Sequence, residues 1–277
     1  MNLYYAIGGG LGHLARAQAF LLMQGIEDFK VITASPFASM YFSPRRLILV
    51  PEELERSPNS LTVYLQEIIA GSGARSVYLD AFPLGILGEL NGIDWGSRSL
   101  YYVTRRMKWQ KYSAKVRSDI KFDCTFLLEP PDDGHRNFIN NSSGEIKETR
   151  LTYPHHAAGK NAVLAKRSKR QKWLVVHSGP VKEVSALLAR ARKDIGKDNA
   201  DPMLYIITQE SDIHDPSISI MNLCPAHGYF KYADRIYSGC GFNIMMQTKP
   251  YRDKHHFFPF ERKYDDQFWR AEKARKD

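Results

Sequence analysis

The chain has 277 residues, of which 43% are hydrophobic and 25% charged, with a formal net charge of +9. This length allows two compact domains, and this composition excludes a disordered or low-complexity protein. The sequence contains no signal-peptide pattern and no run near the roughly 18 apolar residues that a membrane span needs. Its three cysteines have no Cys-x-x-Cys spacing, which fits a reducing compartment. We therefore expect a soluble, cytoplasmic protein.

The first half of the chain alternates short apolar runs with helical patterns, which is typical of α/β units around a largely parallel sheet. Strands are predicted over residues 2–8, 29–36, 45–51, 76–82, 99–106 and 123–131, and helices over 12–25 and 61–73. The polar stretch 130–160 has few periodic apolar positions and predicts a connection between domains. We accordingly predict one domain over residues 1–158 and a second over 159–277.

The second half repeats this alternation. Strands are predicted over 172–180, 202–210 and 218–225, a helix over 181–196, and a short helix, a strand and a glycine turn over 227–243. Open parallel sheets present their functional loops at the carboxyl ends of their strands. Two such domains facing each other across a cleft would hold any chemistry there.

A glycine loop, "AIGGGLGHLARAQAF", joins the first predicted strand to the first helix and places His13 directly behind Gly12. A strand, glycine loop and helix aim backbone N–H groups at an anion. The spacing does not match a dinucleotide fingerprint, because the third glycine would fall on His13, and no P-loop lysine follows. The loop suits close approach of a bulky substrate, and the imidazole of His13 can accept a proton from an attacking hydroxyl. A helix-capping or packing role for His13 is the alternative.

These residues resemble the loop and histidine of GT-B glycosyltransferases, nearest in type to the lipid-linked N-acetylglucosaminyltransferase of peptidoglycan synthesis and the galactolipid synthases. "YADRIYSGCGFNIMMQT" is similar to that family's strand and glycine turn, and "FFPFERKYDDQFWRAEKA" is similar to its donor-binding segment. The resemblance implies two Rossmann-like domains facing across a cleft. The family usually continues through a further helix, so the second domain would be shortened at its C-terminus.

The resemblance also implies a hexosyltransferase that uses a nucleotide sugar, expected to be UDP-linked, as substrate, with no cofactor and no metal. His13 would be the base, and Asp80, at the end of the strand in "YLDAFPLGILGEL", would orient it or bind an acceptor hydroxyl. The residues predicted to bind the nucleotide sugar are Gly9, Gly10, Gly12, Ser178, Gly179, Gly239, Gly241, Phe242, Asn243, Glu261, Asp265, Asp266 and Gln267. Two alternatives stay open: Asp80 as a turn cap, and Asp265 with Asp266 as a plain helix N-terminus.

The reaction itself has alternatives. The same fold resembles the nucleotide-sugar hydrolases of nonulosonic-acid synthesis, in which water is the acceptor, and a non-catalytic nucleotide-sugar-binding protein is a third possibility. The basic stretch 98–117 would meet an anionic membrane surface or a lipid-linked acceptor, unless it is only a solvated face. Nucleic-acid binding is not expected, because no helix-turn-helix, zinc-finger or RNA-recognition pattern occurs.

Overall fold

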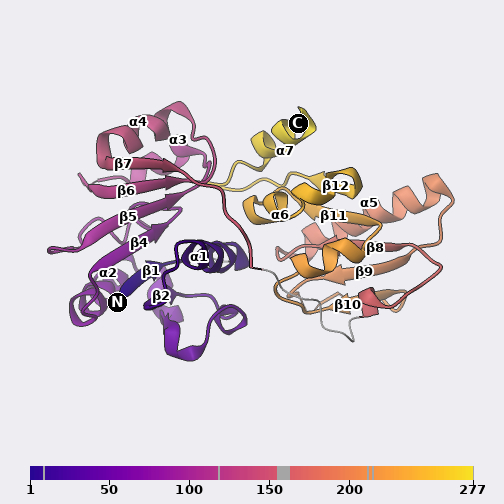
Figure 1. Ribbon diagram of the computed structural model, residues 1–277, viewed down its shortest axis with the longest axis horizontal. Helices are drawn as coiled ribbons and strands as arrows, with labels where there is room; N and C mark the ends of the chain where they lie inside the picture. Colours follow the sequence, from indigo (N-terminus) through magenta and orange to yellow (C-terminus); the bar gives the residue numbers. More distant parts are fainter. Residues whose placement is uncertain (9, 118, 155–162, 211, 214, 277) are drawn as a thin grey trace. The chain divides into compact units, whose positions relative to one another are not determined.

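The computed structural model describes residues 1–8, 10–117, 119–154, 163–210, 212–213 and 215–276 (Figure 1). The chain forms two compact units: Met1–Tyr153 with Lys263–Asp265, and Pro154–Arg262 with Asp266–Asp277. The predicted boundary between residues 158 and 159 lies outside the described residues.

The first unit contains a seven-stranded sheet in the order β3-β2-β1-β4-β5-β6-β7. Its strands are Asn2–Tyr5 (β1), Phe29–Thr33 (β2), Leu47–Leu49 (β3), Ser76–Asp80 (β4), Ser99–Thr104 (β5), Phe122–Leu127 (β6) and Ser143–Glu148 (β7), and neighbours pair in parallel. Its helices are Leu11–Met23 (α1), Pro58–Gly71 (α2), Trp109–Tyr112 (α3) and Asp133–Ser142 (α4).

Helices cover both faces of this sheet. The side chain of Ser57 accepts a hydrogen bond from the Ser60 amide and Pro58 occupies the first turn, so α2 starts with a regular cap. Its Leu65 is fully buried in the core on one face of the sheet. On the other face, Phe20 of α1 packs edge-on against Phe126 of β6 at 4.9 Å between ring centroids. In the inner strands β1 and β4, side chains that point to both faces are therefore buried, as is typical of a parallel sheet covered by helices.

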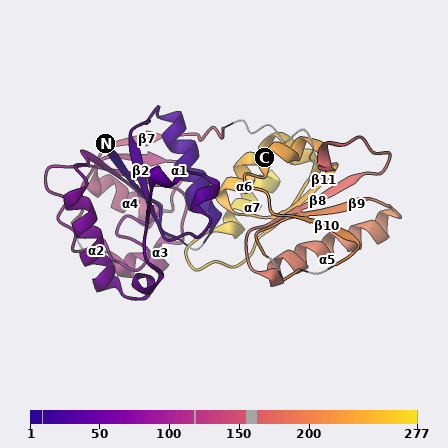
Figure 2. The same ribbon diagram turned by 90° about the horizontal axis from the view of Figure 1, so that it is seen from below.

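The second unit contains a five-stranded parallel sheet in the order β10-β9-β8-β11-β12. Its strands are Lys172–Val176 (β8), Met203–Ile207 (β9), Ile218–Met221 (β10), Arg235–Gly239 (β11) and His255–Phe258 (β12), and its helices are Val181–Asp198 (α5), Phe242–Gln247 (α6) and Gln267–Lys276 (α7). Leu187 of α5 packs on one face of this sheet, while Ile244 of α6 packs on the other (Figure 2).

Both sheets have a topological switch point, where neighbouring strands are followed by connections that run to opposite sides. It lies between β1 and β4 in the first unit and between β8 and β11 in the second. Ligands of open parallel sheets bind outside the carboxyl ends of the strands at such a point. The prediction of two Rossmann-like α/β domains is confirmed.

The stretch 130–160, predicted as a connection between domains, contains α4 and β7 of the first unit in its first part. Strand β7 lies at the edge of the sheet beside β6, and five of its six residues are exposed, so its sequence lacks the apolar alternation of a buried strand.

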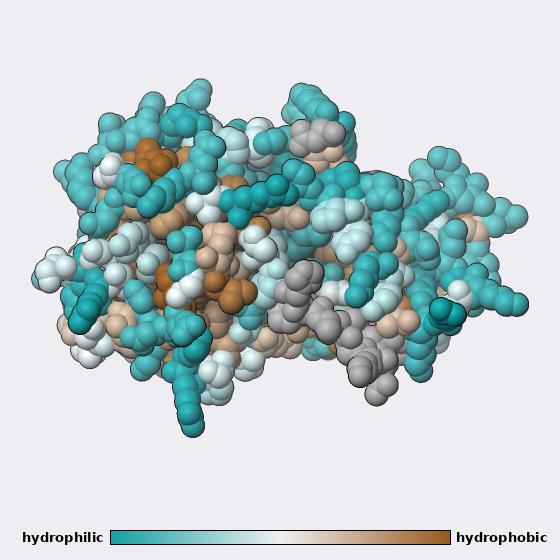
Figure 3. Space-filling view, viewed as in Figure 1, coloured by the Kyte–Doolittle hydropathy of each residue, from teal (hydrophilic) through white to brown (hydrophobic). Residues whose placement is uncertain are grey.

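On the face drawn in Figure 3, small groups of hydrophobic residues show among hydrophilic ones. No described helix is long and apolar enough to cross a membrane.

Candidate active site

His13 and Asp80 meet at the switch point of the first unit. His13 lies in the first turn of α1, after the glycine loop that leaves β1, and Asp80 is the last residue of β4. The His13 Nδ1 atom is 2.5 Å from Asp80 Oδ2. The His13 side chain keeps 12% of its surface exposed, whereas that of Asp80 has none. The structure thus places Asp80 to orient His13, and buries it too deeply to meet an acceptor hydroxyl directly.

Arg16 forms an ion pair with the Asp80 carboxylate and holds it in place. Arg16 Nε donates to Asp80 Oδ1 at 2.6 Å and Arg16 Nη2 donates to Oδ2 at 2.5 Å, while the Tyr4 hydroxyl donates to Oδ1 at 3.1 Å. Burial by itself would raise the pKa of Asp80. Arg16 and His13 outweigh this effect and hold the pKa well below its ordinary value. Asp80 is therefore ionised and its negative charge is balanced by Arg16.

This arrangement determines the tautomer of His13. An Nδ1 lone pair facing the Asp80 carboxylate would be repelled, so Nδ1 carries the proton and donates it to Oδ2. Burial lowers the pKa of His13, and this effect outweighs the opposite influence of Asp80. The imidazole is neutral near pH 7, and Nε2 holds the lone pair of a general base.

The backbone around this pair is specialised. Ala81, directly after Asp80, has a φ of 63°, a left-handed conformation that costs a non-glycine residue about 1 kcal/mol or more. Gly8 lies against the His13 ring: a Cβ atom there would be 2.3 Å from Nε2. Gly10 precedes α1 with an extended φ of −144°, Gly12 lies in its first turn, and Gly9 lies outside the described residues.

The second unit holds a similar cluster at its own switch point. His177 follows β8, and its Nε2 atom is 2.6 Å from Glu183 Oε2 in the first turn of α5. Arg262 Nη1 donates to Glu183 Oε1 at 2.5 Å, and its Nη2 donates to Oε2. Burial lowers the pKa of His177, and this effect outweighs the hydrogen bond to Glu183, which raises it. Each unit thus carries an imidazole, a carboxylate and a guanidinium at the same topological position.

Three predicted glycines of the second unit lie at or near this cluster. A Cβ atom on Gly179 would be 2.6 Å from His177 Nε2, and one on Gly239 would be 3.0 Å from His177 Cε1. Gly241 precedes α6, a helix of only six residues, which offers little dipole for a diphosphate. Ser178 is exposed, Phe242 is buried and Asn243 is partly buried.

The predicted acidic donor segment is divided between the two units. Asp265 belongs to the first unit and pairs with Arg105. Asp266 accepts a hydrogen bond from the Trp269 amide at 3.2 Å and so caps α7, as in the helix N-terminus alternative. Gln267 is buried, and its Oε1 accepts hydrogen bonds from the Cys240 amide at 3.1 Å and the Phe260 amide at 3.0 Å. Of the four residues predicted in this segment to bind the nucleotide sugar, only Glu261 is exposed.

The basic stretch 98–117 is not one continuous solvated face. The Arg98 guanidinium donates to the Ile69 carbonyl at 2.8 Å, and Arg105 pairs with Asp265. Lys115 Nζ donates to the Leu87 carbonyl at 3.4 Å, whereas the Arg117 side chain is exposed.

Across the described residues, no group of three or more His, Cys, Asp or Glu side chains is arranged to hold a metal ion.

No protein-family model matches the sequence, and no curated protein matches it significantly. Solved structures do match. The chain is similar to the spinosyn forosaminyltransferase SpnP, with a TM-score of 0.63 at 11% identity over 99% of this chain and 83% of that one. It is similar to the glycotransferase of kitacinnamycin, with a TM-score of 0.60 at 11% identity over 99% and 84%. The UDP-GlcNAc 2-epimerase from Neisseria meningitidis bound to UDP-GlcNAc gives a TM-score of 0.64 at 10% identity over 100% and 85%.

The chain has the GT-B fold. The predicted resemblance to GT-B glycosyltransferases is thereby confirmed for the architecture. At the switch points of this GT-B fold, five further cluster residues were not predicted: Tyr4, Arg16, His177, Glu183 and Arg262. Arg16 carried one usable signal, because it follows His13 by three residues and so shares its helix face. Glu183 and Arg262 are 79 residues apart and carried none.

Proposed function

We propose that this protein is a glycosyltransferase that moves a sugar from a nucleotide sugar, UDP-linked, to an acceptor hydroxyl. The observation that carries the proposal is the neutral imidazole of His13, oriented by the ionised, buried Asp80 at the switch point of the first unit. The names of two matching structures, a forosaminyltransferase and a glycotransferase, support the assignment to sugar transfer.

In this proposal, His13 Nε2 accepts the proton of the acceptor hydroxyl. The acceptor oxygen forms a bond to the anomeric carbon while the bond from that carbon to the diphosphate oxygen breaks, and the electron pair leaves with the nucleoside diphosphate. Asp80 stabilises the imidazolium that forms, and Arg16 keeps Asp80 ionised. General-base catalysis of this kind contributes about 10²- to 10⁴-fold.

The second unit is proposed to bind the nucleotide. Ser178, Gly179 and Gly239 lie at the carboxyl ends of β8 and β11, where the exposed Ser178 and the loop backbone would contact the diphosphate, while Gly179 and Gly239 leave room for the His177 ring. Two matching structures, of the S. aureus protein MnaA with UDP and of the meningococcal epimerase with UDP-GlcNAc, support a uridine nucleotide as the ligand.

Product analysis tests this proposal. Purified protein is incubated with UDP-linked and other nucleotide sugars, with and without hydroxyl acceptors, and released nucleoside diphosphate and glycosylated acceptor are quantified. We expect transfer that persists in EDTA, and its loss in His13→Ala with UDP binding retained. An absence of nucleotide binding across the panel, or full transfer by His13→Ala, would contradict the proposal.

A second candidate is hydrolysis of the nucleotide sugar, as in enzymes of nonulosonic-acid synthesis. It is favoured by the match to UDP-GlcNAc 2-epimerases, whose name describes a reaction on the nucleotide sugar itself. Free sugar appearing from UDP-GlcNAc alone, at a rate that no acceptor increases, would select this candidate. Nucleotide binding without turnover on any donor would select a non-catalytic sugar-nucleotide-binding protein.

A further inference from the structure

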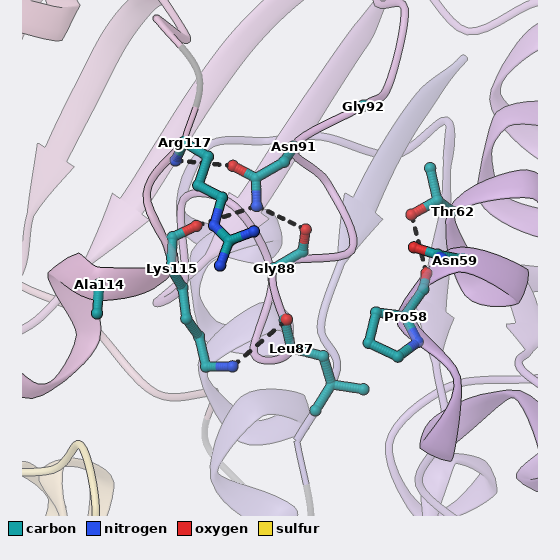
Figure 4. A pocket seen from close by; sticks show the side chains of 10 residues that line it. All are labelled: Pro58, Asn59, Thr62, Leu87, Gly88, Asn91, Gly92, Ala114, Lys115 and Arg117. Carbon is teal, nitrogen blue, oxygen red and sulfur yellow. Dashed lines mark hydrogen bonds between the residues drawn. The ribbon is translucent and has the colours of Figure 1, made fainter.

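A cavity of about 550 Å³ lies in the first unit, within the size range of small-molecule sites. One wall is the start of α2, with Pro58, Asn59 and Thr62, and the opposite wall comprises Leu87–Gly92 and Ala114–Arg117 (Figure 4). Leu61 and Leu65 of α2 pack on the sheet face opposite to that of α1. The cavity therefore lies on the α2 face, whereas His13 and Arg16 belong to α1.

The walls of this cavity are held in place before any ligand arrives. The Asn91 amide donates to the Gly88 carbonyl at 2.7 Å and to the Lys115 carbonyl at 3.0 Å, and its Oδ1 accepts from the Arg117 amide at 3.0 Å. Asn91 thus ties together the two segments of one wall. The Thr62 hydroxyl donates to the Glu89 carbonyl at 2.6 Å and joins that wall to α2. A preorganised site loses less entropy on binding.

The charge of the lining is positive. Lys115 and Arg117 are the two charged residues among those that line the cavity, and none of the lining residues is acidic. The nearby Glu89 carboxylate is fully buried, where it accepts hydrogen bonds from the Tyr5 hydroxyl at 2.5 Å and the Leu87 amide at 2.7 Å. The positive N-terminal end of α2 faces the same space.

Two side chains of the lining are available to a ligand. Within the described part of the chain, neither the Arg117 guanidinium nor the Asn59 amide has a hydrogen-bond partner, and both residues are exposed. In the view of Figure 4 the Arg117 guanidinium lies among the residues of its own wall, between Lys115 and Gly88, with the α2 residues farther away. A guanidinium beside an ammonium matches a doubly charged phosphate better than a single carboxylate.

We propose that this cavity binds the phosphate group of a phosphorylated polar small molecule, separately from the proposed nucleotide-sugar chemistry. Arg117 and Lys115 neutralise the phosphate, and the Asn59 amide binds the hydroxyl groups of the attached polyol. The same chemistry suits a soluble phosphate ester and the phosphate of a lipid headgroup.

The experiment uses glycerol 3-phosphate as the soluble probe and phosphatidic acid vesicles as the lipid probe, with calorimetry for the first and co-sedimentation for the second. Arg117→Gln removes the exposed cation. Gly92→Leu fills the cavity instead, because a Cβ atom there has as its nearest contact the Thr62 methyl at 3.7 Å. Arg75→Gln is the matched control, since Arg75 is exposed and precedes β4, at the end opposite Asp80.

We expect wild-type protein to bind glycerol 3-phosphate, and Arg117→Gln and Gly92→Leu to weaken binding at least tenfold, while Arg75→Gln changes it less than twofold. The same pattern with vesicles alone would assign the phosphate to a lipid. UDP binding should be unchanged in Arg117→Gln, which separates this site from the proposed nucleotide site. Failure of both probes, equal weakening by Arg75→Gln, or full binding by both cavity variants would overturn the proposal.

Discussion

The His13 ring lies against Gly8, so that a Cβ atom on residue 8 would be only 2.3 Å from its Nε2 atom. No real side chain tolerates that contact without a shift of the ring. The position of the proposed base therefore depends on the missing side chain of its neighbour across the loop. With a larger residue at position 8 the ring would have to shift, which would disturb the hydrogen bond from His13 Nδ1 to Asp80.

We predict that Gly8→Ala displaces the His13 ring and lowers kcat about 10²-fold or more, since a base out of position loses its catalytic effect. UDP binding should be retained. Gly71→Ala is the control, because a Cβ atom on Gly71 meets nothing within 4 Å at the end of α2. Equal turnover by Gly8→Ala and wild type would refute the assigned role of His13.

The rate of sugar transfer should follow the deprotonated form of His13. Burial lowers the pKa of His13 below its ordinary value of 6.5. As pH rises, kcat/KM should therefore rise and reach its plateau at a lower pH than an ordinary histidine would give. The measurement is a pH profile of kcat/KM with nucleotide binding followed in parallel. A rising limb centred above 6.5 would show that another group is the base.

We predict that Asp80→Asn destabilises the first unit by about 3–5 kcal/mol, because it leaves Arg16 as an uncompensated buried charge. The pKa of Asp80 is lowered on folding, so its stabilising effect is complete above its ordinary value of 3.8 and is lost as pH falls. Urea unfolding followed by circular dichroism measures the change.

The control for this variant is Asp201→Asn. Asp201 pairs with Arg170 at 2.7 Å, but both side chains are more than half exposed, so the free energy of unfolding should change by less than about 1 kcal/mol. Similar small effects for both variants would show that the Asp80 charge is not needed to hold Arg16.

Gly179→Ala should disturb the cluster of the second unit. A Cβ atom there would lie 2.6 Å from His177 Nε2 and 2.9 Å from Glu183 Oε2, close to both atoms of that hydrogen bond. We expect UDP affinity to fall about tenfold or more, because the loop after β8 must move. Gly196→Ala, inside α5 where a Cβ atom meets nothing within 4 Å, should leave affinity unchanged. Unaltered affinity in Gly179→Ala would argue against a nucleotide site at this loop.

The sequence predicted the elements that bury both faces of a sheet. Strand β1 and helix α1 carry clear apolar patterns because more than half of the residues of each are buried. Strand β7 was missed because an edge strand buries little, and α4 because it is short and polar. Both elements were missed because they are largely exposed, since an apolar periodicity in the sequence indicates burial and not hydrogen bonding.

The candidate site was predictable only in part. His13 was found because it follows the glycine loop, and Asp80 because it stands at the end of a strand pattern. Arg16 was missed because an arginine in a helix normally lies at the surface, whereas here it is 2% exposed. Asp266 and Gln267 show a different ambiguity, because polar residues that cap a helix or bind backbone amides have the same sequence pattern as ligand-binding ones.

Residues Lys263–Asp265 complete the first unit from the far end of the chain. The Tyr264 ring packs against Phe82 and Tyr112, and its carbonyl accepts a hydrogen bond from the Lys108 amide at 2.7 Å. Translation reaches these residues only after residue 262, so Phe82 and Tyr112 lack their contact with Tyr264 throughout translation of residues 1–262. A fragment of residues 1–153 would lack Tyr264 and leave Phe82 and Tyr112 without this contact. Cutting the chain at a single peptide bond therefore cannot separate the two units intact.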